Sequence, residues 1–368
     1  MTDQVYALSS VSILLTTVFM PVLVKYLYHP SRKYAGYQKR NIMHCRRNEE
    51  LRVLACIHMP DDIAAITKLL EVSCPSSERP LAIYVLHLIE LIGRDSPIFI
   101  SHQMQKKIVS KNSSYSENII LAFNHFKQHN PGVVLVNIFT TISLPKFMHE
   151  DICMLGLDKL TYLIILPFHR KWSIDSLVDS EDSTIRTLNC SMLELAPCSV
   201  GILVDRGHLG RSMVSSNSSY YVAMIFLGGN DDREALSFAK RMANDSNITL
   251  TVVHFVASGS DVDSCWDKFL DNEILKDVKL NNVGDEYVIY LEEVVKDGPQ
   301  TALIVRSLVD EFDLIIVGRR HNVDSPQTSG LAEWIEFPEL GIMGDLIASS
   351  NINKKTSVLV VQQQQIDS

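Results

Sequence analysis

The stretch "YYVAMIFLGGNDDREALSFAKRMAND", residues 220–245, decides the fold class of this chain. It begins with a continuous apolar run, which is typical of a strand buried on both faces of a parallel sheet. Gly228 and Gly229 then close the strand, and the apolar residues that follow recur with the period of a helix. We interpret Asp231 and Glu234 as a capping box at the start of that helix. A strand, a tight turn and a helix in this order predict one unit of an open α/β sheet.

The same alternation of strand-length apolar runs and helical segments continues along the chain. The strands predicted in the first half are 51–58, 81–88, 132–139, 162–168 and 198–204, and those in the second half are 220–228, 248–256, 286–293, 313–318 and 357–362. Helices are predicted after Asp61, over 117–127, 148–155 and 183–195, and from Gly298 onward. We therefore expect an α/β fold with two tandem, doubly wound, Rossmann-like domains, each containing a five-stranded parallel sheet.

A Gly- and Ser-rich stretch without periodicity, "DRGHLGRSMVSSNSS" at residues 205–219, separates the two strand sets. Such a composition is typical of a linker between domains. The expected division is a membrane helix at 1–28, a basic linker at 29–50, a first α/β domain at 51–205, a linker at 206–219 and a second α/β domain at 220–363.

The chain opens with a long apolar run, in which no charged residue occurs between Asp3 and Lys25. This length suffices to cross a hydrocarbon core of about 30 Å. Basic residues follow directly, with Tyr26 and Tyr28 at the expected headgroup level, so the positive-inside rule places the body of the chain in the cytosol. We expect a protein of the plasma membrane or an endomembrane. A signal peptide and a buried helix of a soluble core remain as alternatives.

Composition disfavours several other classes of protein. The net charge of the 368 residues is −9, which argues against a nucleic acid partner. The seven cysteines include no C-x-x-C pair, and "MHEDIC" at 148–153 places its potential ligands on different sides of a helix, so we expect no metal site. G-x-S-x-G and P-loop motifs do not occur. We therefore expect no enzyme, no catalytic residue and no cofactor.

Several motifs in order along the chain carry a resemblance to a known family. They are "HPSRKYAGYQKRNI" (29–42), "LIILPFHRKW" (163–172), "APCSVGILVDRG" (196–207), "FLGGNDDREAL" (226–236), "IIVGRRH" (315–321) and "EFPELGIMGD" (336–345). With them the chain resembles the last membrane helix and cytosolic tail of plant cation/proton exchangers of the CHX family, which are monovalent cation:proton antiporters. Each α/β unit also resembles a universal-stress-protein domain.

The resemblance implies a function for the chain. It indicates the cytosolic regulatory tail of a monovalent cation antiporter, with potassium as the cation, in ion and pH homeostasis. The implied partners are a transmembrane antiporter domain, a second copy in a homodimer, and, for the complete proteins, a monovalent cation and a proton. The family's transport site belongs to helices outside this sequence, so the chain is not expected to transport ions by itself. The alternative is a soluble universal-stress-like protein that binds an adenine nucleotide, and a weaker one is a small-molecule enzyme.

The universal-stress-protein resemblance also implies a degenerate nucleotide or anion site. Its candidate residues are Gly228, Gly229, Gly318, Arg319, Arg320 and Gly344. In that family the phosphate loop has a second glycine and a hydroxyl residue, whereas this chain has His321 and Asp345 at those positions. The first unit has Pro167, which offers no N–H. We therefore expect no binding of ATP in the manner of that family, while binding of another anion stays open.

Two loops of opposite halves, "LPFHRKW" (166–172) and "VGRRHN" (317–322), follow matching strands. Open α/β sheets bind ligands at this carboxyl edge, so each loop is expected either to meet an anion or an acidic segment, or to be simply solvated. His169 and His321 are candidate pH sensors. Because each adjoins an arginine, we expect the pKa of each imidazole to be lowered.

Overall fold

The structure is a computed structural model, and it describes most of the α/β part of the chain. The described residues are 4, 9–17, 19–20, 40–46, 49–93, 96–102, 113–172, 178–206, 209, 219–243, 245, 247–258, 266–281, 287–321, 325–349 and 356–364. No helix within these ranges is both long enough and apolar enough to cross a membrane. The predicted membrane helix at 1–28 and the predicted linkers at 29–50 and 206–219 lie in large part outside the described residues.

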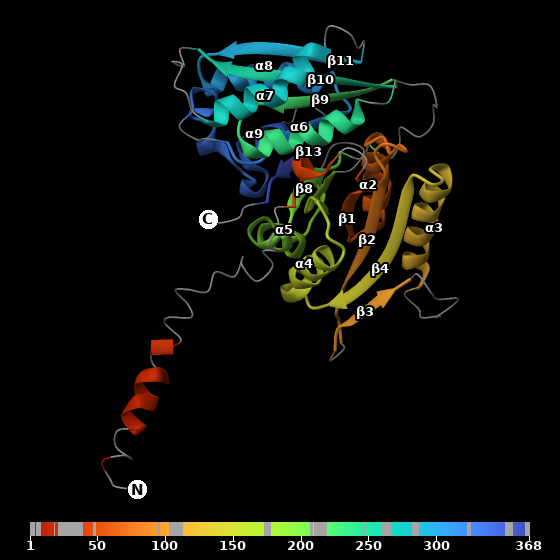
Figure 1. The fold of residues 1–368 in the computed structure, drawn as a ribbon, viewed down its shortest axis with the longest axis vertical. Coiled ribbons are helices and arrows are strands. Elements are labelled where there is room, and N and C mark those ends of the chain that lie inside the picture. Colours follow the sequence, from red (N-terminus) through yellow and green to blue (C-terminus); the bar gives the residue numbers. More distant parts are fainter. Residues whose placement is uncertain are drawn as a thin grey trace.

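One 11-stranded, mostly parallel sheet runs through the described part of the chain (Figure 1), in the order β11-β10-β9-β12-β13-β8-β5-β1-β2-β4-β3. Its strands are β1 (Leu51–Ile57), β2 (Leu81–Glu90), β3 (Ile98–Ser101), β4 (Val134–Ser143), β5 (Leu163–Pro167), β8 (Ser199–Val204), β9 (Tyr220–Phe226), β10 (Ile248–Ala257), β11 (Val288–Val295), β12 (Leu314–Gly318) and β13 (Ser357–Gln362). Every strand except β3 was predicted from the sequence. A separate hairpin consists of β6 (Arg170–Trp172) and β7 (Val178–Glu181).

The two predicted sets of five parallel strands are joined into one sheet. Each half does contribute five parallel strands, but β8 and β13 pair antiparallel and merge the two sets. The register runs from Val204 opposite Val358 to Val200 opposite Gln362. Without this pairing both strands would be open edges with unsatisfied N–H and C=O groups. The two halves therefore meet through backbone hydrogen bonds at the centre of the sheet (Figure 1).

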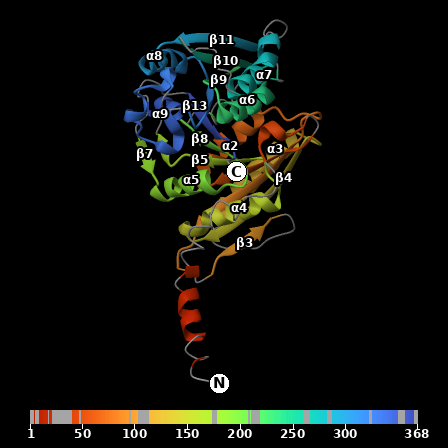
Figure 2. The same cartoon turned by 60° about the vertical axis from the view of Figure 1, so that its left-hand side comes forward.

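Helices cover both faces of the sheet, as a doubly wound fold requires (Figure 2). One face carries α2 (Pro60–Val72), α3 (Ser113–His129), α6 (Asn230–Met242) and α7 (Trp266–Asn281), which share one hydrophobic core with the strands. The other carries α4 (Met148–Asp158), α5 (Ser183–Leu195), α8 (Gly298–Val309) and α9 (Gly341–Ser349) over a second core. The predicted α/β class is therefore confirmed.

The start of α6 differs from the predicted capping box. The helix begins at Asn230 after Gly229, and no side chain caps it. Gly228 and Gly229 have φ values of 112° and 100°, a backbone region that favours glycine, and they make the tight turn out of β9. Asp231 and Glu234 therefore lie inside the helix, where their carboxylates are available to other parts of the chain.

The strand order reverses between β9 and β12. From β9 the chain proceeds outward to β10 and β11, whereas β12 and β13 lie on its other side. At such a reversal the loops after the two strands diverge, and ligands of open α/β sheets usually bind there. The loop after β12 carries the predicted site residues Arg319, Arg320 and His321, and the first turn of α6 lies opposite them.

Candidate functional site

Asp232, in the first turn of α6, occupies the point where the strand order reverses. Its Oδ2 accepts the backbone N–H groups of Leu227 at 2.7 Å and Gly228 at 2.9 Å. Its Oδ1 accepts the N–H of Gly318 at 2.9 Å. Nε2 of His321 lies 3.2 Å from both carboxylate oxygens, and the Asp232 side chain is fully buried. One carboxylate thus ties together the ends of β9 and β12.

Asp231 makes the neighbouring contact with Arg320. Its Oδ2 accepts the backbone N–H of Arg320 at 2.9 Å and the guanidinium Nε–H at 2.8 Å, while its Oδ1 accepts from Nη2 at 2.5 Å. The N–H of Gln363, just beyond β13, donates to the same Oδ1 at 2.9 Å. A bidentate arginine–carboxylate pair with two further backbone donors is a strong and geometrically specific contact. We call Asp231, Asp232, Arg320 and His321 the carboxylate cluster.

The aspartates of the carboxylate cluster accept hydrogen bonds from the N–H and guanidinium groups that would otherwise bind a phosphate. Of the six predicted residues, Gly228, Gly318 and Arg320 do come together, but their donors point at the chain's own aspartates. The N–H of Gly229 is shared by both oxygens of Asp271, at 3.2 and 3.3 Å. Backbone N–H groups and a guanidinium around an anion form an oxyanion cradle, and here the anions are carboxylates of α6 and, for Gly229, of α7.

The two remaining predicted residues serve other contacts. The Arg319 guanidinium donates to the carbonyl oxygens of Glu339 at 2.9 Å and Pro338 at 3.0 Å, and to the Gln362 side chain at 2.8 Å. Gly344 lies on α9, where a Cβ would come within 2.6 Å of the Val360 side chain. Its smallness thus serves the close packing of α9 on β13 rather than an approach to phosphate.

The expected pKa direction of His321 is wrong. Burial alone would lower its pKa, but the carboxylates of Asp232 and Asp231 outweigh burial and raise the pKa above the ordinary value of 6.5. The adjoining Arg320 does not reverse this, because its guanidinium is paired with Asp231. Protonated His321 therefore stabilises the fold fully below about pH 6.5, and this contribution is lost as the pH rises through the raised pKa.

The first half has a smaller counterpart of the carboxylate cluster. Asp62, in the first turn of α2, accepts the N–H groups of His58 at 3.1 Å and Met59 at 2.8 Å, and it pairs with Lys171 at 2.9 Å. Burial lowers the pKa of His58 to about 4, so this imidazole is neutral at physiological pH. No group of three His, Cys, Asp or Glu side chains within the described ranges is arranged to hold a metal ion.

His169, the other predicted pH sensor, lies between the two halves. Its buried imidazole is 3.1 Å from Oε1 of Glu339, and Arg186 lies 3.3 Å from the same oxygen. Burial would raise the pKa of Glu339, but His169 and Arg186 outweigh it and hold this pKa below the ordinary value. Arg170 pairs with Glu336 at 3.0 Å. The basic loop "LPFHRKW" thus meets an acidic segment, and that segment is "EFPEL" (336–340) of the second half.

An aromatic cluster completes this contact between the halves. The ring of Phe337 lies edge-on to Phe168 at 5.2 Å, and the Arg170 guanidinium stacks 4.5 Å from its centre. Phe337 and Phe168 are both buried. Two motifs that carried the family resemblance are therefore a complementary pair inside one chain.

Glu234, two residues after Asp232, connects α6 to the predicted linker at 29–50. Its side chain is completely buried and accepts the N–H groups of Ile42 at 2.5 Å and Met43 at 3.2 Å. The hydroxyl of Ser199, at the start of β8, donates to the same carboxylate at 2.7 Å. Burial raises the pKa of Glu234 despite these hydrogen bonds. This buried carboxylate is thus held by donors from two distant parts of the chain, residues 42–43 and Ser199.

Residues 40–45 make further contacts around Glu234. The backbone N–H of Arg40 donates to the side chain of Gln364 at 2.8 Å, and its guanidinium reaches the carbonyl of Leu157 at 3.5 Å. Ile42, in the short helix η2 (Ile42–His44), is 4% exposed and packs in the core that α6 covers. We call residues 40–45 the docked segment, since it binds both halves at their junction.

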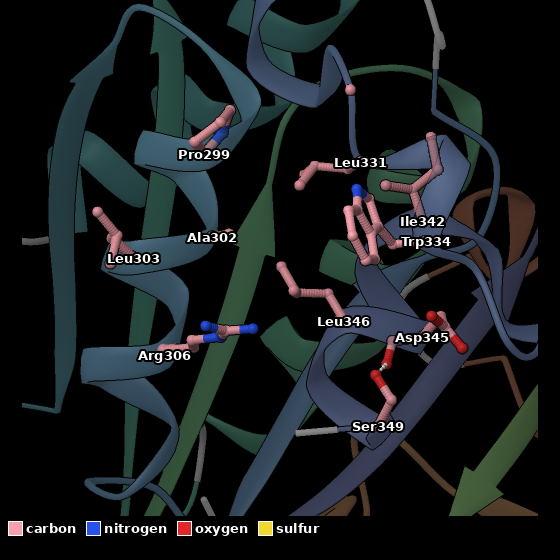
Figure 3. A pocket seen from close by; sticks show the side chains of 11 residues that line it. Pro299, Ala302, Leu303, Arg306, Leu331, Trp334, Ile342, Asp345, Leu346 and Ser349 are labelled. Atoms are coloured by element: carbon pink, nitrogen blue, oxygen red, sulfur yellow. Dashed lines mark hydrogen bonds between the residues drawn. The ribbon is translucent and has the colours of Figure 1, made fainter. Parts of the chain in front are cut away.

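A separate hollow of about 640 Å³ lies between α8 and α9 (Figure 3). Apolar side chains dominate its lining, and Trp334, 82% exposed, stands at its rim. The Arg306 side chain extends from α8 toward Leu346 (Figure 3). Asp345 also borders the hollow, but its carboxylate accepts the N–H groups of Glu336 and Phe337. None of the residues predicted as a nucleotide site lines this hollow.

Sequence reasoning missed the residues that matter most in the cluster. Asp231 and Glu234 were interpreted as local helix caps, and Asp232 was assigned no role. A usable signal was present, because three acidic residues within four positions open a helix opposite a loop with two arginines and a histidine. Acidic residues at a helix start are common, however, so this signal alone does not identify their partners.

The fold is similar to solved structures of universal stress proteins. One from Archaeoglobus fulgidus DSM 4304 is 15% identical, with a TM-score of 0.45, covering 85% of this chain and 96% of that chain. A putative universal stress protein from Pseudomonas aeruginosa UCBPP-PA14 is 13% identical, with a TM-score of 0.41, covering 88% of this chain and 95% of that chain.

Sequence comparison identifies the family. The family model described as "Plant cation/H(+) antiporter domain" matches residues 83–208, and the one described as "Plant cation/H(+) antiporter, C-terminal domain" matches 219–362. Cation/H(+) antiporter 3 of Arabidopsis thaliana is 46% identical over 99% of this chain and 46% of its own length. Cation/H(+) antiporter 8 of the same plant is 45% identical over 99% of this chain and 45% of its own length. The chain thus spans about half the length of these curated relatives, and it belongs to the plant cation/H(+) antiporter family.

Proposed function

We propose that this chain is the cytosolic regulatory part of a monovalent cation/proton antiporter that exchanges potassium for protons in ion and pH homeostasis. The family supports the class of transporter. The single observation that carries a regulatory role is the docked segment, residues 40–45, held by Glu234 at the junction of the halves. This segment follows the predicted membrane helix in the sequence. A conformational change in the α/β part would therefore be transmitted to that helix through residues 40–45.

A complete antiporter carrying this tail provides the test. Proton gradients in membrane vesicles are followed by dye quenching, and potassium is added to start exchange. Glu234→Ala should change the exchange rate or its pH dependence, because it leaves the N–H groups of Ile42 and Met43 unpaired. Trp334→Ala, at an exposed position, is the control and should behave as the parent. Deletion of residues 40–364 without any effect on exchange would refute the regulatory role, and equal exchange with sodium would refute potassium selectivity.

The proposed location is the plasma membrane or an endomembrane, with the α/β part in the cytosol and a transmembrane antiporter domain as the partner. A homodimer is the proposed assembly. We predict that the full chain sediments with membranes and that deletion of residues 1–30 releases it. An intact chain that stays in the high-speed supernatant without detergent would contradict this location.

No specific observation favours the alternative of a soluble nucleotide-binding protein. The donors of Gly228, Gly318 and Arg320 that such a protein would offer to phosphate already hold Asp231 and Asp232. The carboxylates of Asp231 and Asp232 belong to the same chain and lie within four residues of Gly228. They therefore compete with any free anion at a high effective concentration.

A further inference from the structure

α6 presents two of its carboxylates to two different parts of the chain. Asp232 faces His321 and the strand ends, whereas Glu234 faces the docked segment. Successive helical residues are rotated by about 100°, so side chains two positions apart point to nearly opposite sides of a helix. The first turn of α6 therefore lies between the carboxylate cluster and residues 40–45, and any displacement of this turn moves both contacts together.

We propose that the surface formed by α6, the start of β8 and residues 363–364 binds the docked segment reversibly. We further propose that the protonation state of His321 controls how tightly this surface binds the segment. The protonated imidazole holds Asp232 and fixes the first turn of α6. Loss of that proton weakens the hold on Asp232, so the turn loosens and Glu234 releases the N–H groups of Ile42 and Met43. The segment is thus bound at lower pH and released at higher pH.

The charges around His321 support this direction. Asp232 and Asp231 face it from α6, and Arg320 in its own loop is neutralised by Asp231. On β10, His254 interacts with the same Asp232, but burial lowers the pKa of His254 to about 4, so it stays neutral in the relevant range. Of the two described imidazoles that interact with Asp232, His321 is therefore the one whose pKa is raised rather than lowered.

The thiols near Glu234 do not oppose this direction. The charge of Glu234 acts on the thiols of Cys45 and Cys198, and burial raises the pKa of both, so neither carries charge near neutral pH. Burial raises the pKa of Glu234, whereas the N–H groups of Ile42 and Met43 lower it, so release of the segment removes contributions of both signs. By linkage at His321, acid therefore favours the bound segment and alkali favours its release.

The inference rests on the proposed function only for its consequence in transport, so its test uses this chain alone. Hydrogen exchange of the Ile42 and Met43 amides, expressed as protection factors, is measured from pH 6 to 8.5 on the full chain. Protection should fall as the pH rises, by about tenfold for each unit by which folding raises the pKa of His321. In His321→Gln the protection should be low and independent of pH. His129→Gln, on the exposed surface of α3, is the matched control and should follow the parent.

A reciprocal measurement covers the case in which His321→Gln fails to fold. If His321 and the docked segment are coupled, weakening the segment must shift the pKa of His321 toward its ordinary value. The imidazole of His321 is titrated by NMR in the parent and in Glu234→Gln, with Glu333→Gln at an exposed position as the control. A lower His321 pKa in Glu234→Gln supports the coupling. An unchanged His321 pKa, or amide protection that does not depend on pH in the parent, overturns it, whatever the transport assays show.

Discussion

Gly318 and Asp232 approach each other so closely that no side chain fits between them. The N–H of Gly318 donates to Oδ1 of Asp232 at 2.9 Å, and a Cβ on Gly318 would lie 2.4 Å from that oxygen and 2.6 Å from the backbone nitrogen of Asp232. The glycine is therefore required by the position of α6 against the end of β12. In a nucleotide-binding loop the same glycine would make room for phosphate.

Replacing Gly318 by alanine should destabilise the fold by about 1–3 kcal/mol, because the added methyl group forces the backbone of α6 away from β12. Urea unfolding followed by circular dichroism measures the loss. Gly156→Ala is the matched control, since its Cβ would meet nothing closer than the Thr161 hydroxyl at 3.2 Å and alanine favours the helix there. Equal stability of Gly318→Ala and the parent would contradict the close approach.

The chain should bind neither ATP nor AMP up to millimolar concentration, because Asp231 and Asp232 occupy the donors that a phosphate would need. Isothermal titration calorimetry on the full chain tests this expectation. Micromolar binding of ATP that Arg320→Gln weakens would show that the nucleotide displaces the carboxylates. We expect no measurable heat of binding from a chain whose fold is intact by circular dichroism.

Much of the fold follows from local patterns in the sequence. Continuous apolar runs such as 163–167 and 314–318 predict buried parallel strands, because both faces of such strands are covered. β6 and β7 escaped prediction since they are short and mostly polar. The pairing of β8 with β13 was not predicted either. The local pattern of apolar residues shows that a segment is a strand, but it does not show which distant strand pairs with it.

The site was less predictable than the fold for the same reason. Glu234 contacts Ile42 across 192 positions and Ser199 across 35, and nothing in the residues around Glu234 encodes those partners. The position of His321 at the end of β12 was predictable, whereas the direction of its pKa shift depends on Asp232, 89 positions away. Neighbouring residues in sequence predicted the wrong sign, because the charges that decide a pKa are neighbours in space.

Glu339→Gln should lower stability by about 1–3 kcal/mol at pH 7, since it removes the charge that His169 and Arg186 face in a buried contact. The pKa of Glu339 is lowered, so its contribution is present above its ordinary value of 4.5 and is lost as the pH falls through the lowered value. The difference from the parent should therefore shrink below about pH 4.5. Urea unfolding at pH 7, 5 and 4 measures it. Glu333→Gln, exposed in the same loop region, is the control, and a difference that grows toward acid would contradict the pairing.

Limited proteolysis should cut the chain first within residues 206–219, because that stretch lacks apolar periodicity between two complete strand sets. The two fragments should nevertheless stay together under native conditions. β8 and β13 hold them by backbone pairing from Val200 to Val204, and the contact of Phe168 with Phe337 adds buried apolar area. Size-exclusion chromatography after the first cut, with the fragments identified by mass spectrometry, measures both expectations. First cleavage inside 51–205 would count against the proposed domain boundary. Fragments that separate without denaturant would show that the junction is too weak to carry a signal from one half to the other.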